Sequence, residues 1–162
     1  MLWTIGHSNQ PIDRFIGLLA LYGIEDVYDV RSKPYSRFNP QFGRDRLQTA
    51  LRHAGIGYVY MGHALGGHPE DPCCYQNGKL SYALQARTPM FRSGLEILRS
   101  DAATKDIAIM CAEKDPLQCH RFHSICANLD DMEINHILHN GQMISQRELL
   151  LPQETPQKVF AF

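Results

Sequence analysis

The sequence lacks the features that mark membrane proteins and strongly basic nucleic-acid-binding proteins. No apolar run among its 162 residues approaches the ~20 residues that a membrane-spanning helix needs. The 16 lysines and arginines nearly balance the 17 aspartates and glutamates, so nucleic acid would have to bind through a local patch, without support from net charge. The opening residues, MLWTIGHSN, contain no basic segment and no long apolar stretch. We therefore expect no signal peptide, no membrane contact and a cytoplasmic location.

Paired-cysteine motifs are also missing. The chain has five cysteines, an odd number, and no two of them form a CxxC pair. This pattern predicts free thiols in a reducing compartment and supports neither a zinc ribbon nor a thioredoxin-type motif. Without CxxC or HxxxH spacing we expect no metal site. The adjacent Cys73 and Cys74 are interpreted as ordinary loop cysteines.

What is present is a regular alternation of strand-like and helix-like segments. Strands are predicted at 2–5, 27–30, 58–61, 107–110 and 134–138. Helices are predicted from Pro11 to Tyr22 and over 44–54, 82–99 with a break at Pro89, 117–129 and 145–150. The alternation predicts one α/β domain over 1–162, with a core at 1–141 and a tail at 142–162. We expect three α/β/α layers around a mostly parallel sheet of about five strands.

Residues that carry chemistry follow four of the predicted strands. Two long loops, 33–43 and 62–79, also follow strands, and loops of such length are usually functional. In a parallel sheet all of these strand ends lie at one edge, so we expect a binding or active site there. The candidate residues are His7 and Ser8; Asp29, Arg31, Ser36, Arg37 and Asn39; His63; and Cys111, Glu113, Cys119, His120 and Arg121.

The three arginines among these candidates suit an anion. A guanidinium binds phosphate or carboxylate through two parallel hydrogen bonds, so Arg31, Arg37 and Arg121 are expected to hold an anionic group. Free backbone N–H groups at the start of the 117–129 helix would add to this binding. In the alternative interpretation, Arg31 pairs with Asp29 or Glu113 as a structural clamp.

Proton transfer and nucleophilic attack have separate candidates. Glu113 is the first candidate for a general acid or base, with His7 as an alternative, although Glu113 would also suit a role in orienting an arginine. Cys119 is the better nucleophile, because a helix start, a histidine and an arginine would lower its pKa. Cys111 directly follows a buried strand and is expected to be structural in the first instance.

Four segments together resemble the DUF488 family, a domain of unknown function. They are TIGHSN, DVRSKPYSRFNPQF, YMGHALGG and MCAEKDPLQCHR, in that order, and the resemblance runs from Thr4 to about Gly141. It implies a small cytosolic α/β protein of bacteria or archaea and assigns no reaction. The motif residues are His7, Ser8, Asp29, Arg31, Ser36, Arg37, Asn39, Cys111, Glu113, Cys119, His120 and Arg121.

A weaker similarity is to rhodanese-like domains, which also place Asp-Val-Arg after one strand and a catalytic cysteine after a later one. The loop AEKDPLQ after Cys111 is not a compact glycine-containing cradle, and Arg121 lies ten positions after that cysteine. This spacing also departs from the Cys-x5-Arg pattern of thiol phosphatases.

Three functions are consistent with these residues. The first is an enzyme acting on an anionic or phosphate-bearing small substrate such as a nucleotide, in which the arginines bind the anion and Glu113 or His7 moves a proton. The second is a non-catalytic module that binds nucleotide or nucleic acid. The third is a thiol-dependent enzyme that uses Cys119 or Cys111. The sequence points to no cofactor and to no oligomeric state.

Overall fold

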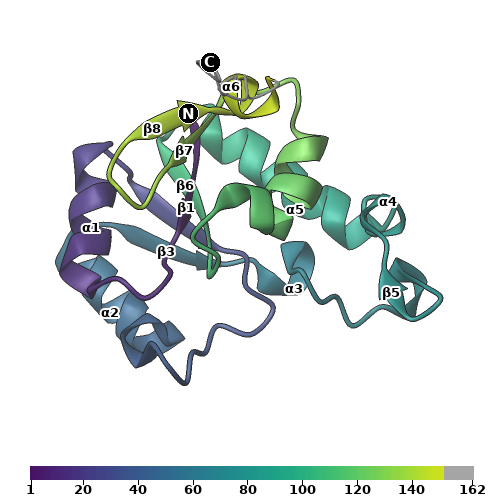
Figure 1. Cartoon of the computed structure of the whole chain (residues 1–162), viewed down its shortest axis with the longest axis horizontal. Helices are drawn as coiled ribbons and strands as arrows, with labels where there is room; N and C mark the ends of the chain where they lie inside the picture. Colours follow the sequence, from purple (N-terminus) through teal and green to yellow (C-terminus); the bar gives the residue numbers. More distant parts are fainter. Residues whose placement is uncertain (152–162) are drawn as a thin grey trace, which may run out of the picture.

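A computed structural model describes residues 1–151 of the chain, which form a central sheet with helices on both faces (Figure 1). The strands are β1 (Leu2–Gly6), β2 (Asp26–Asp29), β3 (Gly57–Tyr60), β6 (Ile107–Cys111), β7 (Ile134–Ile137) and β8 (Met143–Ser145). Their order in the six-stranded sheet is β3-β2-β6-β1-β7-β8. The pairs among β3, β2, β6, β1 and β7 are parallel, and β8 runs antiparallel to β7.

The five predicted strands are therefore confirmed to within one residue at each end, and the mostly parallel sheet with them. β1 and β6 are buried along their whole length, which is why both read as continuous apolar runs rather than as alternating patterns. The edge strand β8 lies within the expected tail and was not predicted. The end of that tail, 152–162, lies outside the described residues.

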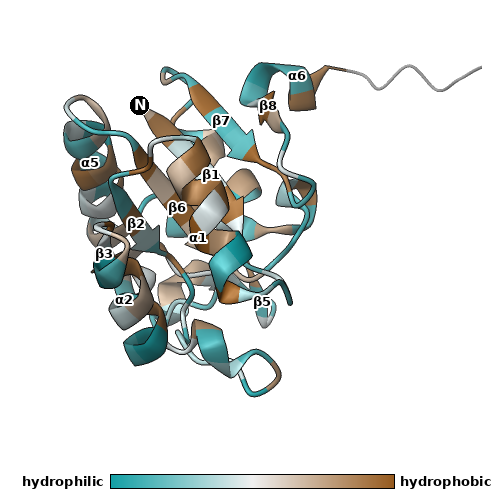
Figure 2. Ribbon diagram, turned by 90° about the vertical axis from the view of Figure 1, so that its left-hand side faces the viewer, coloured by the Kyte–Doolittle hydropathy of each residue, from teal (hydrophilic) through white to brown (hydrophobic). Residues whose placement is uncertain are grey.

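Two apolar layers hold the helices against the sheet, as Figure 2 shows for the apolar residues of β1, β6 and α1. On one face, Trp3 and Ile5 of β1 pack in the cluster that includes Phe15 of α1 (Ile12–Leu21) and Leu51 of α2 (Arg44–His53). On the other face, Leu2 of β1 packs in the cluster of α3 (Gly62–Leu65) and α5 (Pro89–Ala102). Successive residues of β1 thus face opposite layers, and the three-layer architecture is confirmed.

Local sequence signals explain most helix boundaries. Gly23 and Gly55 follow α1 and α2 with φ of +66° and +74°, a conformation that glycine adopts without strain. Pro89 starts α5 after the short α4 (Tyr82–Gln85), and the Thr88 hydroxyl accepts a hydrogen bond from the Phe91 N–H. The predicted break at Pro89 is confirmed. The short α6 (Gln146–Leu150) begins with a capping box between Ser145 and Glu148.

The predicted continuous helix over 117–129 is wrong. The segment consists of three short turns, η3 (Pro116–Gln118), the π-helical η4 (Arg121–Ile125) and η5 (Cys126–Asn128). The Asp115 carboxylate caps η3, and Cys119 then adopts an extended conformation with φ of −129° and ψ of 143°. Cys119 thus separates η3 from the contiguous η4 and η5, and the helical turns begin after Cys119, whose sulfur accepts a hydrogen bond from the Arg121 N–H at 3.5 Å.

The second long loop is partly regular. It contains η2 (Pro72–Cys74) and a hairpin of β4 (Tyr75–Gln76) and β5 (Lys79–Leu80), turned at Asn77 and Gly78, both with positive φ. The first long loop holds only η1 (Pro40–Phe42). Among the helices of residues 1–151, none is long and apolar enough to cross a membrane.

The order of the strands creates an opening at one edge of the sheet. After β1 and β2 the chain turns to the face covered by α1 and α2, and after β6 it turns to the opposite face. Since β6 lies between β2 and β1, the loops diverge around its carboxyl end. This divergence is the point where open α/β sheets bind ligands, and here it falls at Cys111.

A buried histidine ties β1, β7 and α6 together. The imidazole of His136 has Nδ1 2.8 Å from the Thr4 hydroxyl and Nε2 2.7 Å from Gln146 Oε1. With Nε2 protonated, the ring donates to Gln146 and accepts from Thr4, so it is satisfied in the neutral form. Burial, together with the charge of Arg121, lowers the pKa of His136 from 6.5 to about 4.

Stability is therefore expected to fall as the pH drops from 6.5 towards about 4, because the unfolded chain takes up a proton that folded His136 rejects. A shift of this size corresponds to roughly 3 kcal/mol at about 1.4 kcal/mol per pKa unit. Urea unfolding across this range should show a shallower pH dependence for His136→Gln than for the wild type. The exposed His53 gives the matched control His53→Gln. Equal slopes for wild type and His136→Gln would contradict the assignment.

Candidate active site

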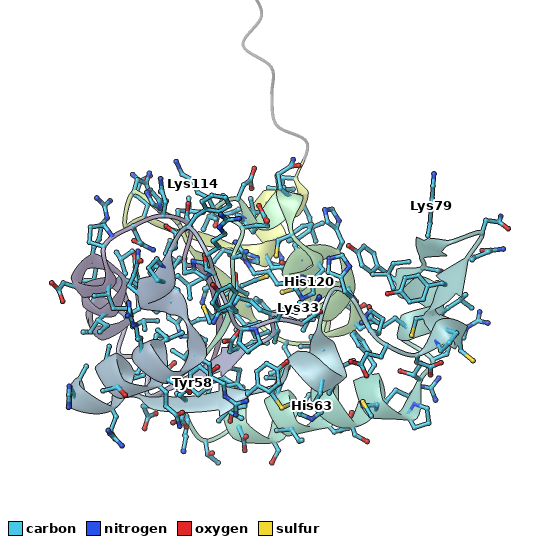
Figure 3. The ribbon with its side chains drawn as sticks, turned by 90° about the horizontal axis from the view of Figure 1, so that it is seen from below. Lys33, Tyr58, His63, Lys79, Lys114 and His120 are labelled. Carbon is cyan, nitrogen blue, oxygen red and sulfur yellow. The ribbon has the colours of Figure 1, made fainter. Side chains whose placement is uncertain are left out.

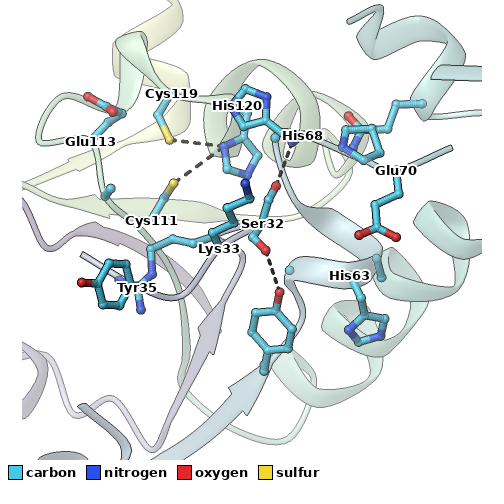
Figure 4. Close-up of a pocket in the computed structure, with 18 of the residues that line it drawn as sticks. Ser32, Lys33, Tyr35, His63, His68, Glu70, Cys111, Glu113, Cys119 and His120 are labelled. Atoms are coloured by element: carbon cyan, nitrogen blue, oxygen red, sulfur yellow. Dashed lines mark hydrogen bonds between the residues drawn. The ribbon is translucent and has the colours of Figure 1, made fainter. Parts of the chain in front are cut away.

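The diverging loops enclose a cavity of about 1590 Å³, larger than the ~300–1,000 Å³ of typical small-molecule sites (Figure 4). It lies at the carboxyl ends of β1, β2, β3 and β6, and the segment after α3 forms its far wall. The candidate residues that line it are His7, Ser8, Arg31, Ser36, Asn39, His63, Cys111, Glu113, Cys119 and His120. Three other candidates, Asp29, Arg37 and Arg121, do not line it.

Arg31 is held in a buried ion pair with Asp29. Its Nε donates to Asp29 Oδ1 at 2.8 Å and its Nη2 to Oδ2 at 2.6 Å, with both side chains almost fully buried. Its Nη1 donates to the Phe42 carbonyl at 2.9 Å. The Tyr58 hydroxyl also donates to Asp29, at 2.8 Å. This arrangement is the structural clamp of the alternative interpretation, and it fixes the start of the loop after β2.

His7 is part of the same network. Its Nδ1 lies 2.7 Å from the Ser8 carbonyl oxygen and its Nε2 3.2 Å from Arg31 Nη1. Nδ1 therefore carries the proton and Nε2 accepts from the guanidinium. Burial, helped by Arg31, lowers the pKa of His7 to about 4, and the ring stacks on Phe42. Both ring nitrogens are engaged, which leaves neither free for the proton transfer expected of His7.

Arg121 lies beneath the cavity as a buried cation without a carboxylate. Its side chain is 1% exposed, and its Nη1 and Nη2 donate to the carbonyls of Glu113 at 2.7 Å and Lys114 at 3.4 Å. Among residues 1–151 no acidic side chain pairs with it, and its Nε has no partner. Arg121 thus shapes the loop after β6 from inside and leaves an uncompensated positive charge near the cavity floor.

This close packing explains the glycine at the end of β1. A Cβ atom at Gly6 would lie 1.9 Å from the Glu113 carbonyl oxygen and 3.2 Å from Arg121 Nη2. No other residue fits without displacing the backbone of the loop that carries Glu113. Glu113 itself is exposed at the cavity wall, so its carboxylate stays available for the predicted acid–base role.

Two thiols and an imidazole meet at the cavity floor. His120 Nδ1 lies 3.7 Å from the sulfur of Cys111, at the end of β6, and 3.8 Å from the sulfur of Cys119 (Figure 4). The three atoms lie within 4.8 Å of one another. Gly67 packs on the imidazole, since a Cβ there would lie 2.9 Å from His120 Nδ1. The structure brings together three candidates from the two ends of one loop.

The pKa values of the two thiols are shifted in opposite directions. The pKa of Cys119 is lowered, first by a hydrogen bond from the Cys111 thiol and then by His120 and Arg121. The backbone N–H of Arg121 also donates to its sulfur, at 3.5 Å. The pKa of Cys111 is raised well above its ordinary value by its bond to Cys119 and by burial. The directions of the two shifts favour loss of the first proton of the pair from Cys119.

The same three atoms are close enough to contact one metal ion. Tetrahedral zinc sites take sulfur and nitrogen ligands, and a site with three protein ligands keeps its fourth position for water or substrate. Within residues 1–151 no other group of three such side chains gathers closely enough. We expected no metal site because the sequence has no CxxC or HxxxH spacing. Such spacing detects ligands that are close along the chain and does not detect residues that the fold brings together.

The cavity is also lined by residues that sequence reasoning missed. Lys33 and His120 lie near the middle of the molecule seen from below, with Lys79 out at the hairpin (Figure 3). Ser32 accepts a hydrogen bond from the His68 N–H at 2.8 Å and thereby joins the two long loops. The other missed lining side chains include Tyr35, Tyr60, Glu70 and Tyr82. The sequence feature that could have indicated these residues is the length of the two loops.

The clamp on Asp29 gives a direct test of this geometry. Asp29→Asn leaves Arg31 buried without its counter-charge and should destabilise the fold by about 3–5 kcal/mol. Asp131→Asn is the matched control, because the Arg99–Asp131 pair is exposed and should contribute less than ~1 kcal/mol. Urea unfolding at neutral pH measures both. A loss of unfolding free energy in Asp29→Asn no larger than that in Asp131→Asn would show that the pair with Asp29 does not hold Arg31.

Comparison with known proteins gives one match. The family model described as "Domain of unknown function DUF488" matches residues 11–124. Comparison with curated proteins and with solved structures finds no match. The matched region covers more than half of the chain and includes Cys111, Cys119 and His120 of the cavity floor, with Arg121 beneath them. The protein therefore belongs to the DUF488 family, whose function is unknown.

Proposed function

We propose that this protein is a thiol-dependent enzyme in which Cys119 attacks an electrophilic substrate held in the cavity. The observation that carries the proposal is the cluster of Cys111, Cys119 and His120 at the floor of a cavity at the strand ends. A nucleophilic thiol needs a partner that stabilises the thiolate and a group that can move a proton. Arg121 and the Cys111 thiol supply the first, and His120 supplies the second.

The buried charge of Arg121 adds to the effects of Cys111 and His120, which lower the pKa of Cys119 more strongly. A guanidinium removed from water is costly unless an anion lies near it. Its hydrogen-bond partners in the structure are neutral carbonyls, whereas its charge lowers the pKa of Cys119. A thiolate at Cys119 is therefore the nearby anion that this buried cation favours. Cys126, fully buried in the adjacent core, has its pKa raised to about 12 by burial.

The cavity offers less support for anion binding by arginine. Most donors of Arg31 are used by Asp29, Phe42 and His7, and Arg121 points at backbone carbonyls. Lys33 lines the cavity with an exposed side chain and would meet an acidic group on the substrate. The anionic substrate and the thiol nucleophile are thus compatible, with Lys33 in the place foreseen for the arginines. A purely binding role leaves the thiol pair unexplained.

Alkylation tests the nucleophile. Iodoacetamide at neutral pH, followed by peptide mass mapping, should modify Cys119 more than ~10-fold faster than the exposed Cys73, because the thiolate is the reactive form. Cys126→Ala serves as the matched buried control and should leave this rate unchanged. Far-ultraviolet absorbance gives a second readout that needs no access for a reagent: a thiolate signal should persist in mildly acidic solution and vanish in Cys119→Ser.

Two results would contradict the proposal. One is slow alkylation of Cys119 together with an absorbance that Cys119→Ser leaves unchanged. The other is a stoichiometric metal, found by elemental analysis of the purified protein, whose removal is needed before Cys119 reacts.

Gly67 tests the part played by the imidazole. Gly67→Ala should push the His120 ring away from both sulfurs, because the new Cβ would lie 2.9 Å from ring atoms. The alkylation rate of Cys119 is expected to fall several-fold at unchanged secondary structure. Gly17→Ala, whose Cβ would meet nothing within 4 Å, is the control. An unchanged rate in Gly67→Ala would exclude His120 from activating the thiol.

A further inference from the structure

The second thiol of the cluster has no role in a simple nucleophilic attack. Cys111 follows β6 directly, and its sulfur lies within 4.8 Å of Cys119 Sγ and His120 Nδ1. Cys126, although buried in the same core cluster, is not part of this group of three. A disulfide needs a sulfur–sulfur distance of ~2.05 Å, so the two sulfurs, which lie within 4.8 Å of each other, must move together for the bond to form.

From this juxtaposition we infer that Cys111 and Cys119 act as a redox pair that exchanges with low-molecular-weight disulfides, with Cys119 attacking and Cys111 resolving. The inference rests on the proposed function and specifies its reaction. The occupant of the cavity is then a substrate with a sulfur–sulfur bond. Two neighbouring thiols at the floor of an open cavity suit such a substrate, because one sulfur attacks the substrate and the other must then reach the sulfur of the first.

The reaction has two balanced steps. In the first, the Cys119 thiolate attacks one sulfur of a disulfide RSSR, forming a Cys119–SR mixed disulfide and releasing RS⁻. In the second, the Cys111 thiolate attacks Cys119 Sγ, forming the Cys111–Cys119 disulfide and releasing the second RS⁻. The protein loses two electrons and RSSR gains them. The Cys111 proton passes by way of His120, 3.7 Å away, to a departing thiolate.

The surroundings of the two sulfurs favour this order of steps, because the backbone N–H of Arg121 donates to the Cys119 sulfur at 3.5 Å. The interaction with Cys119, followed by burial, raises the pKa of Cys111. Once Cys119 is bonded to a second sulfur it no longer carries negative charge, and the first of these causes is removed. The charge of Arg121, which lowers the pKa of both thiols, is unchanged. Attack by Cys119 thus prepares Cys111 for the resolving step, and Cys111 does not compete for the first.

Glutathione disulfide is a suitable probe. The experiment uses the full chain carrying Cys73→Ser, which removes the exposed thiol, and follows the products by intact mass after acid quenching. The parent should lose two hydrogens without accumulating a glutathione adduct, and dithiothreitol should restore its thiols. With Cys111→Ser the adduct on Cys119 should accumulate and decay at least ~10-fold more slowly. Cys126→Ala should behave as the parent does.

The outcomes separate the two proposals. A parent protein that accumulates the Cys119 adduct as persistently as Cys111→Ser overturns the redox pair and leaves the nucleophilic Cys119 intact. Failure of Cys119 both to form an adduct and to alkylate overturns the proposed function as well. Circular dichroism checks that Cys111→Ser is folded, and Cys111→Ala provides a second variant if it is not. Loss of two hydrogens by Cys119→Ser as fast as by the parent would also overturn the inference, because the disulfide formed would not involve Cys119.

Discussion

The burial of the Arg121 guanidinium shapes the floor of the cavity. Among residues 1–151, its hydrogen-bond partners under the carboxyl ends of the strands are backbone carbonyls. Such a charge must be balanced by its surroundings, and three neighbouring groups respond to it. It lowers the pKa of Cys119 and also contributes to the lowered pKa values of His7 and His136. One residue thus favours a thiolate at the cavity and neutral imidazoles around it.

The two buried arginines each hold one of the loops that form the site. Arg31 is neutralised by Asp29 and holds the loop after β2 through Phe42. Arg121 holds the loop after β6 through backbone carbonyls, and no acidic side chain within residues 1–151 pairs with it. The glycine at position 6 allows this arrangement, because a side chain there would collide with the backbone of Glu113. The resulting floor is closely packed on the side of β1 and β6, and its two thiols have pKa values shifted in opposite directions.

Much of the fold could be predicted because its signals are local. Buried strands such as β6 read as apolar runs, glycines after α1 and α2 mark their ends, and Pro89 marks the start of α5. The prediction failed over 117–129, where Cys119 adopts an extended conformation between two turns. Apolar residues at helical spacing do not reveal such an interruption. β8 was missed because its pairing with β7 depends on a hairpin at the edge of the sheet.

The sequence by itself determined at which edge of the sheet the cavity forms and most of the candidates that line it, since a parallel sheet brings the residues that follow its strands to one side. It could not decide what each residue does there. Two examples are whether Arg31 pairs with a substrate or with Asp29, and whether Cys111 lies beside Cys119. Both depend on how the folded backbone and its loops place these side chains relative to one another. Only the tertiary structure decided these contacts, because burial, hydrogen bonding and charge depend on distances in space and not on separation along the chain.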